Sequence, residues 1–99
     1  MTIAIDYDHT WTLAPSFWKL FAFQCSTFGH RLVCITCRHP DDSVPDDVGL
    51  ALNCVCYTSG IAKQAYAEAS GLSIDVWIDD DPGTICPSKK LSDVSDISL

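Results

Sequence analysis

The chain of 99 residues carries a formal charge of −7, with 13 Asp and Glu against six Lys and Arg, and 47% of its residues are hydrophobic. This length suits one domain with a modest core, and the acidic balance disfavours binding to long nucleic acid, which needs a basic surface. No apolar run approaches the ~20 residues of a membrane span, and the first residues lack the basic and apolar regions of a secretory signal. We therefore expect a cytoplasmic domain with no membrane segment.

Strand and helix patterns alternate from the start of the chain. A short β-prone run at 2–6 (TIAID) is followed by aromatic residues at helical spacing over 15–28, and then by an apolar run at 31–36 (RLVCIT). The polar stretch RHPDDSVPDD predicts a loop, and a brief helical turn is expected at 46–52. The first half of the chain therefore predicts two strands joined by one helix.

The second half continues this alternation. A third strand is predicted at 53–57 (NCVCY), a helix at 61–70 (IAKQAYAEAS), which is rich in helix formers, and a fourth strand at 74–78 (IDVWI). The polar residues from about 88 to 99 predict a short helix or a frayed tail. Such alternation is typical of an α/β fold with a parallel sheet and right-handed crossovers. We expect one domain over 1–99, with its core in about 2–86.

Six cysteines invite a disulfide framework or a metal site. Cys34, Cys54 and Cys56 lie inside apolar runs, where a free cysteine behaves as a small hydrophobic residue. Cys34 and Cys37 form one C-x-x-C pair, but no second pair at zinc-ligand spacing supports it. We favour core cysteines, and the sequence leaves their pairing open.

Each of the four predicted strands is followed by polar residues. Ligands of parallel α/β sheets bind beside the carboxyl ends of the strands, so these residues form the candidate site. Acids gathered at one sheet edge repel one another unless a cation intervenes, and Mg²⁺ prefers oxygen ligands. A hydroxyl and a lysine at the same edge suit the oxygens of a phosphate group. In chain order the candidates are Asp6, Asp8, His9, Thr36, Arg38, Lys63, Asp79 and Asp80.

The order of these residues resembles the haloacid dehalogenase superfamily of phosphohydrolases. A D-x-D-x-T motif follows the first strand at 6–10, a threonine follows the second, a lysine follows the third and acids follow the fourth. The resemblance covers roughly residues 2–86. It implies a three-layer, Rossmann-like parallel sheet of order 4-1-2-3, with helices on both faces.

The resemblance also implies a role for each site residue. Asp6 would be the nucleophile that forms an aspartyl-phosphate, and Asp8 the general acid and base. Thr36 and Lys63 would bind the phosphoryl group. The ligands of Mg²⁺ would be Asp6, Asp8 (through its backbone carbonyl), Asp79 and Asp80.

The chain departs from the superfamily pattern in two positions and in size. His9 and Cys37 stand where glycine is common in the superfamily. The short connections before Arg31 and before Lys63 leave no room for a cap domain, so we expect an open site. Its phosphorylated substrate would be small or the end of a macromolecule. His9 and Arg38 are candidate substrate contacts, although an ion pair with the acidic loop at 41–42 explains Arg38 equally well.

Two other functions compete with a Mg²⁺-dependent phosphatase. A weak or inactive protein of the same fold would act through a protein partner. A phospho-acceptor receiver domain would need an aspartate after the third strand, where this chain has Thr58-Ser59-Gly60. The aromatic residues of the first predicted helix are expected to belong mainly to the core, but so small a sheet should leave one or two rings exposed: the set is Phe17, Trp18, Phe21 and Phe23. Exposed rings of this kind make a homodimer or a partner surface plausible.

Overall fold

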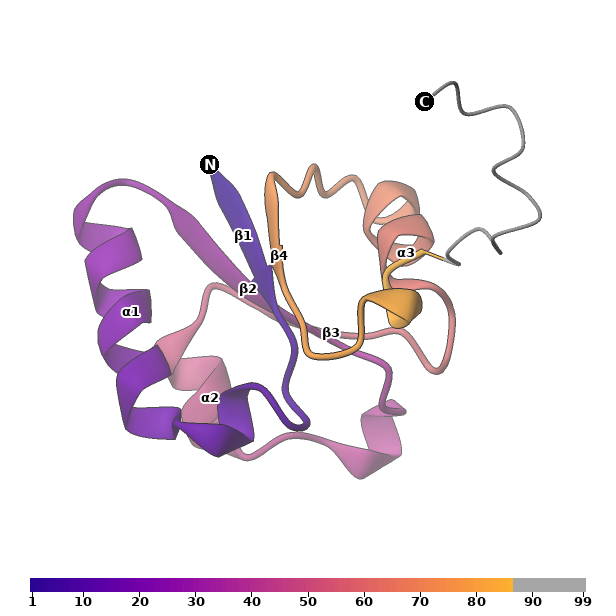
Figure 1. Ribbon diagram of the computed structural model, residues 1–99, viewed down its shortest axis with the longest axis horizontal. Helices are drawn as coiled ribbons and strands as arrows, with labels where there is room; N and C mark the ends of the chain where they lie inside the picture. The colour runs from indigo at the N-terminus through magenta and orange to yellow at the C-terminus, as the bar shows by residue number, and fades with distance from the viewer. Residues whose placement is uncertain (87–99) are drawn as a thin grey trace, which may run out of the picture.

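A four-stranded parallel sheet forms the centre of the computed structural model, which describes residues 1–86. The strand order is β3-β2-β1-β4, which reads 4-1-2-3 from the β4 edge (Figure 1). The predicted α/β class and the parallel sheet are confirmed. The predicted tail at 88–99 lies outside the described residues. The strands are β1 (Thr2–Ile5), β2 (Arg31–Thr36), β3 (Val55–Tyr57) and β4 (Val76–Ile78).

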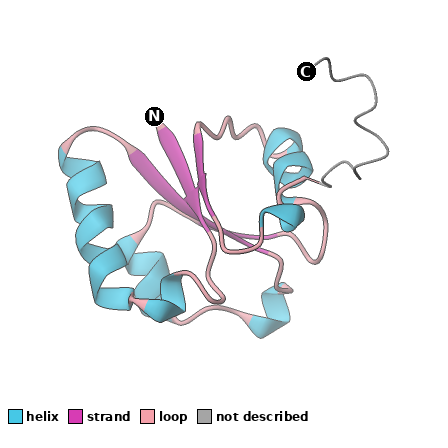
Figure 2. Ribbon diagram, in the orientation of Figure 1, coloured by secondary structure: helices cyan, strands magenta, loops and turns pink. Residues whose placement is uncertain are grey.

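Helices connect the strands and lie on both faces of the sheet (Figure 2). Figure 1 shows α1 and α2 together on one side and α3 on the other. Short 3₁₀ turns lie at Trp11–Leu13, Pro40–Asp42 and Pro82–Thr84. The helices are α1 (Pro15–Thr27), α2 (Asp46–Ala51) and α3 (Lys63–Ala69).

The core is divided by the sheet because successive side chains of a strand point to opposite faces. Ile3 and Ile5 of β1 belong to the cluster that also contains buried residues of α1 and α2. Ala4 lies in the cluster on the α3 side, where Ala67 packs against the sheet. The predicted third and fourth strands are each two residues too long at their start, because pairing begins at Val55 and Val76.

The cysteines are all within the described residues and are free thiols. Cys25 and Cys34 are buried, Cys86 is exposed, and the other three are partly buried. Burial raises the pKa of Cys34 to about 12, so this thiol stays protonated at neutral pH. Cys34 is therefore a core residue, as its apolar run predicts.

The aromatic residues of α1 are divided between core and surface. Trp18 and Phe21 pack against the core, whereas Phe17 and Phe23 are 60% and 66% exposed. Two rings of the set are thus exposed and two are packed, as expected for so small a sheet.

Among residues 1–86, no helix combines the length and the apolar character that a membrane crossing requires.

Candidate phosphate and metal site

The strand ends enclose a cavity of about 170 Å³. Asp6 follows β1, and its backbone N–H donates to the carbonyl of Ile78 at 2.9 Å, which brings Asp6 beside Asp79 after β4. His9 and Cys37 line the cavity too. Arg38 is not part of the lining, whereas the structure brings together the residues predicted for phosphate, metal or catalysis: Asp6, Asp8, Thr36, Lys63, Asp79 and Asp80.

Lys63 joins two of the acids in the buried part of the cavity. Its Nζ lies 2.8 Å from Oδ1 of Asp6 and 2.6 Å from Oδ2 of Asp79. Burial alone would lower the pKa of Lys63, but the hydrogen bonds to Asp6 and Asp79 outweigh it and raise that pKa. Burial raises the pKa of Asp6 against the opposing effect of Lys63. The lysine is thus a fixed cation at the start of α3.

Three carboxylates converge beside this lysine. One oxygen each from Asp6, Asp79 and Asp80 lies within 4.8 Å of the others. The Thr10 hydroxyl donates to Oδ1 of Asp80 at 3.1 Å, and the neighbouring Asp6 carboxyl and then Thr10 lower the pKa of Asp80. Three carboxylates against one lysine leave two negative charges, and all the donors are oxygen. This donor set fits a hard divalent cation such as Mg²⁺.

The carboxylate of Asp8 lies outside this trio and pairs with Arg38. Nε and Nη2 of Arg38 bind its two oxygens at 2.9 and 2.8 Å, and the guanidinium lies 4.9 Å from the centre of the Tyr7 ring. Nη1 of the same arginine binds Asp42 at 3.2 Å. These hydrogen bonds from Arg38 lower the pKa of Asp8. The expected pairing of Arg38 with the acidic loop is thus present at Asp42.

The pairing of Arg38 with Asp8 is a contact that the sequence analysis missed. The sequence carried no signal for it, because the contact depends on how the chain turns after β1, where His9 has a positive φ. The predicted ligand from Asp8 was its backbone carbonyl, and the structure places its side chain on the arginine.

Thr36 occupies the end of β2 and is buried. Its Oγ1 accepts a hydrogen bond from the backbone N–H of Arg38 at 3.3 Å. Among the described residues, no group accepts a hydrogen bond from the Thr36 hydroxyl. Thr36 therefore has a donor to offer to an anion in the cavity.

The turn after β1 has a left-handed residue at His9, where φ is 58°. Glycine adopts this conformation without steric cost, which accounts for its frequency at this position in the superfamily that the motif resembles. The backbone N–H of His9 donates to Oγ1 of Thr12 at 3.0 Å and supports the turn. Cys37 is not among the described residues with positive φ, so it adopts no conformation that demands glycine.

Two threonines contribute to the site beyond the predicted set. Thr10 belongs to the D-x-D-x-T motif, and its contact with Asp80 gives it a role there. Thr84 lines the cavity, and its Oγ1 lies 3.5 Å from Oδ2 of Asp79. Thr84 had no signal in the sequence, because the 3₁₀ turn at 82–84 alone brings it back to the strand end.

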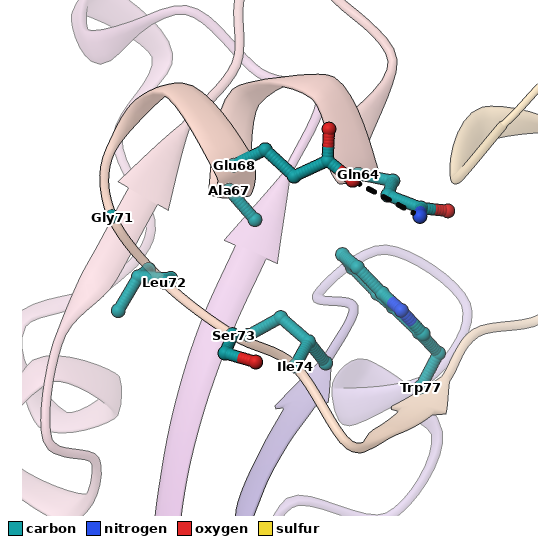
Figure 3. A pocket seen from close by; sticks show the side chains of 8 residues that line it. All are labelled: Gln64, Ala67, Glu68, Gly71, Leu72, Ser73, Ile74 and Trp77. Atoms are coloured by element: carbon teal, nitrogen blue, oxygen red, sulfur yellow. Dashed lines mark hydrogen bonds between the residues drawn. The ribbon is translucent and has the colours of Figure 1, made fainter.

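A second cavity, of about 390 Å³, lies between α3 and β4 (Figure 3). Trp77 forms one wall, and Gln64 and Glu68 form another, with a hydrogen bond of 3.3 Å between their side chains. None of the predicted site residues lines this cavity. The candidate site is therefore the smaller, charged cavity at the strand ends.

No family model, curated protein sequence or solved structure matches this chain.

Proposed function

We propose that this chain is a Mg²⁺-dependent phosphomonoester hydrolase that acts through an aspartyl-phosphate on Asp6. The observation that carries the proposal is that Lys63 and Thr36 line the same cavity as the acidic trio, which consists of Asp6, Asp79 and Asp80. The strand order and the helices on both faces also fit the three-layer, Rossmann-like architecture of haloacid dehalogenase phosphohydrolases. The proposal thus rests on the placement of residues and on a resemblance in motif order.

The first half of the reaction transfers the phosphoryl group to the protein. An oxygen of Asp6 attacks phosphorus, and the bond from phosphorus to the leaving oxygen breaks. Lys63 and Thr36 are placed to bind the phosphoryl oxygens by charge and by hydrogen bonding. A bound Mg²⁺ would neutralise charge between the carboxylates and the phosphoryl group. Water then cleaves the aspartyl-phosphate, which releases phosphate and restores Asp6.

Asp8 is the proposed general acid and base, and its contact with Arg38 limits that role. A general acid needs a proton at the working pH, whereas Arg38 lowers the pKa of Asp8 and holds both of its oxygens. Proton transfer to a leaving oxygen therefore requires Asp8 to leave the arginine. Because this ion pair is partly exposed, an exchange of partners is feasible.

The same ion pair favours a second candidate function. A chain whose Asp8 stays on Arg38 would bind phosphorylated ligands and Mg²⁺ with little turnover, and would act through a protein partner. Binding without turnover predicts that phosphate protects the protein from unfolding while phosphate release stays at the level of Asp6→Asn. Measurable turnover that depends on Asp6 would exclude this candidate.

Phosphate release with and without Mg²⁺ tests the proposed function. The panel should contain an aryl phosphate, nucleotides, sugar phosphates, phosphopeptides and oligonucleotides phosphorylated at either end. Asp6→Asn removes the nucleophile with little change in shape and should reduce the rate at least about a thousandfold. Asp41→Asn is the matched control, because Asp41 is exposed on the 3₁₀ turn after β2. No release by the wild type across the panel, or equal release by Asp6→Asn, would contradict the proposal.

A further inference from the structure

The outer face of α1 is apolar although it faces solvent. Phe17, Leu20 and Phe23 of the helix are 60%, 60% and 66% exposed, and the flanking Leu13 and Phe28 are 76% and 73% exposed. Figure 1 shows that α1 lies at the outside of the molecule, with the sheet on one side of it. Exposed apolar patches of this extent mark interaction surfaces. These five residues are called the α1 face below.

Charge singles out this face from the rest of the molecule. Residues 9–40 contain no Asp or Glu, so every one of the 13 acidic residues lies outside this segment. The charged residue within α1 is Lys19, and its Nζ binds Asp47 at 2.7 Å. Two copies of a chain with a charge of −7 repel each other across acidic surfaces. The five residues of the α1 face carry no charge of their own, so two copies that meet there bring no carboxylates from this segment together.

We propose that two copies of this chain pair through the α1 face, with the two helices antiparallel. Phe17, Leu20 and Gln24 recur at spacings of three and four residues within α1, which aligns them along one seam, as in paired helices. A two-fold axis near Leu20 would set Phe17 of one copy against Gln24 of the other. The seam then runs the length of both helices.

The α1 face also carries a cavity that suits a side chain from a second copy. This cavity has a volume of about 290 Å³ and is lined by Met1, Ile3, Phe21, Cys25 and Phe28, among others. It lies at the end of α1 that the antiparallel arrangement brings to the projecting ring of Phe17. One surface thus supplies both the ring and the cavity. A two-fold interface requires this self-complementarity, because the same patch serves both copies.

The size of the face agrees with a pair of copies. At their observed exposures, the five side chains present roughly 700 Å² of surface, close to the ~800 Å² per partner of a standard protein interface. A small contact from a peptide or a ligand would leave much of this area in water. A second copy presents an apolar face of the same size and places apolar surface against apolar surface.

Sedimentation velocity on the full chain, with a reductant that keeps Cys86 a thiol, tests this inference independently of any enzymatic activity. The wild type should be a dimer that dissociates on dilution. Phe17→Glu places a carboxylate from each copy in an apolar interface, and should raise the dimer dissociation constant about a hundredfold. Leu50→Glu is the matched control, because Leu50 is 87% exposed on α2, outside the α1 face. This variant should dimerise as the wild type does.

Circular dichroism of both variants should match the wild type, since each replaced side chain is exposed. A wild type that stays monomeric at about 100 μM would overturn the proposal, because its dimer would then be weaker than most specific complexes. A dimer that survives Phe17→Glu unchanged, or that Leu50→Glu disrupts equally, would also overturn it.

Discussion

Two clusters, each with carboxylates around one basic side chain, lie at the strand ends, and they differ most in exposure. In the buried cluster, the side chains of Lys63, Asp6 and Asp79 are 2%, 10% and 2% exposed. In the open cluster, those of Arg38 and Asp8 are 25% and 45% exposed. Buried charged groups keep the same partners, because leaving one of them unpaired is costly. Exposed ion pairs exchange partners at little cost. The buried cluster therefore fixes the geometry of the site, and the open cluster is adjustable.

Replacing the lysine of the buried cluster should have the largest effect on stability. Lys63→Met leaves Asp6 and Asp79 without their cation, and should lower the free energy of unfolding by about 3–5 kcal/mol at pH 8. Lys19→Met is the matched control, because its pair with Asp47 is exposed, and should change stability by less than about 1 kcal/mol. Urea denaturation measures both values. Equal, small losses in the two variants would contradict the distinction between the clusters.

The pH dependence of the free energy of unfolding of the wild type provides a further check on the role of Lys63. Its folded pKa is raised above 10.5, so its contribution to stability is complete below pH 10.5 and is lost as the pH rises through the folded pKa. Lys63→Met should lack this alkaline loss. An alkaline loss of the same size in wild type and variant would show that other groups cause it.

Mg²⁺ should stabilise the buried cluster by an intermediate amount. At a hundredfold excess over the dissociation constant, a ligand specific to the folded state adds about 2.7 kcal/mol, which differential scanning fluorimetry detects as a rise in Tm. Asp80→Asn removes one charge of the acidic trio and should reduce this rise, while Asp41→Asn should preserve it. A rise that is the same in all three proteins would place the ion elsewhere.

Releasing Asp8 in the open cluster should alter the choice of leaving group. Arg38→Gln frees the Asp8 carboxyl, and should raise kcat/KM for an alkyl phosphate relative to an aryl phosphate about tenfold. Poor leaving groups depend on a general acid, and good ones do not. Arg31→Gln, at an exposed arginine at the start of β2, should leave this ratio unchanged. An unchanged ratio in Arg38→Gln would mean that the arginine does not restrain Asp8.

The smallest effect is expected at the turn between the two clusters. His9 has a φ of 58°, so His9→Gly should relieve strain and stabilise the fold by about 0.5–1 kcal/mol. His39 has a φ of −79°, and His39→Gly should be neutral or destabilising because it only adds freedom to the unfolded chain. Thermal denaturation compares the two variants. A loss of stability in both would show that the turn holds His9 without strain.

The buried cluster was predictable from the sequence, and the open cluster was not. Asp6, Lys63 and Asp79 each lie next to a strand or begin a helix, so the order of elements alone brings them to one sheet edge. The contact of Arg38 with Asp8 depends on how the chain turns at His9, and no local pattern specifies a left-handed histidine.

For the fold, too, local features were predictable from the sequence and features that depend on contacts between distant segments were not. The sequence pattern located each β-strand and α-helix of residues 1–86, because those signals are local, but it did not predict the three 3₁₀ turns. The starts of β3 and β4 were misplaced, since pairing with a neighbour determines where a strand begins. The sequence predicted one or two exposed rings on this helix but did not identify Phe17 and Phe23 as those rings, because an apolar interaction surface and a buried surface have the same composition.

Detection of the aspartyl-phosphate itself tests the central claim most directly. The wild type is mixed with Mg²⁺ and the most active phosphomonoester of the panel, quenched in acid within the first turnover and digested for mass spectrometry. We expect a phosphoryl group on Asp6 in the wild type and none in the peptide from Asp6→Asn. Phosphate release without any adduct on Asp6, or an adduct on a different residue, would contradict the account.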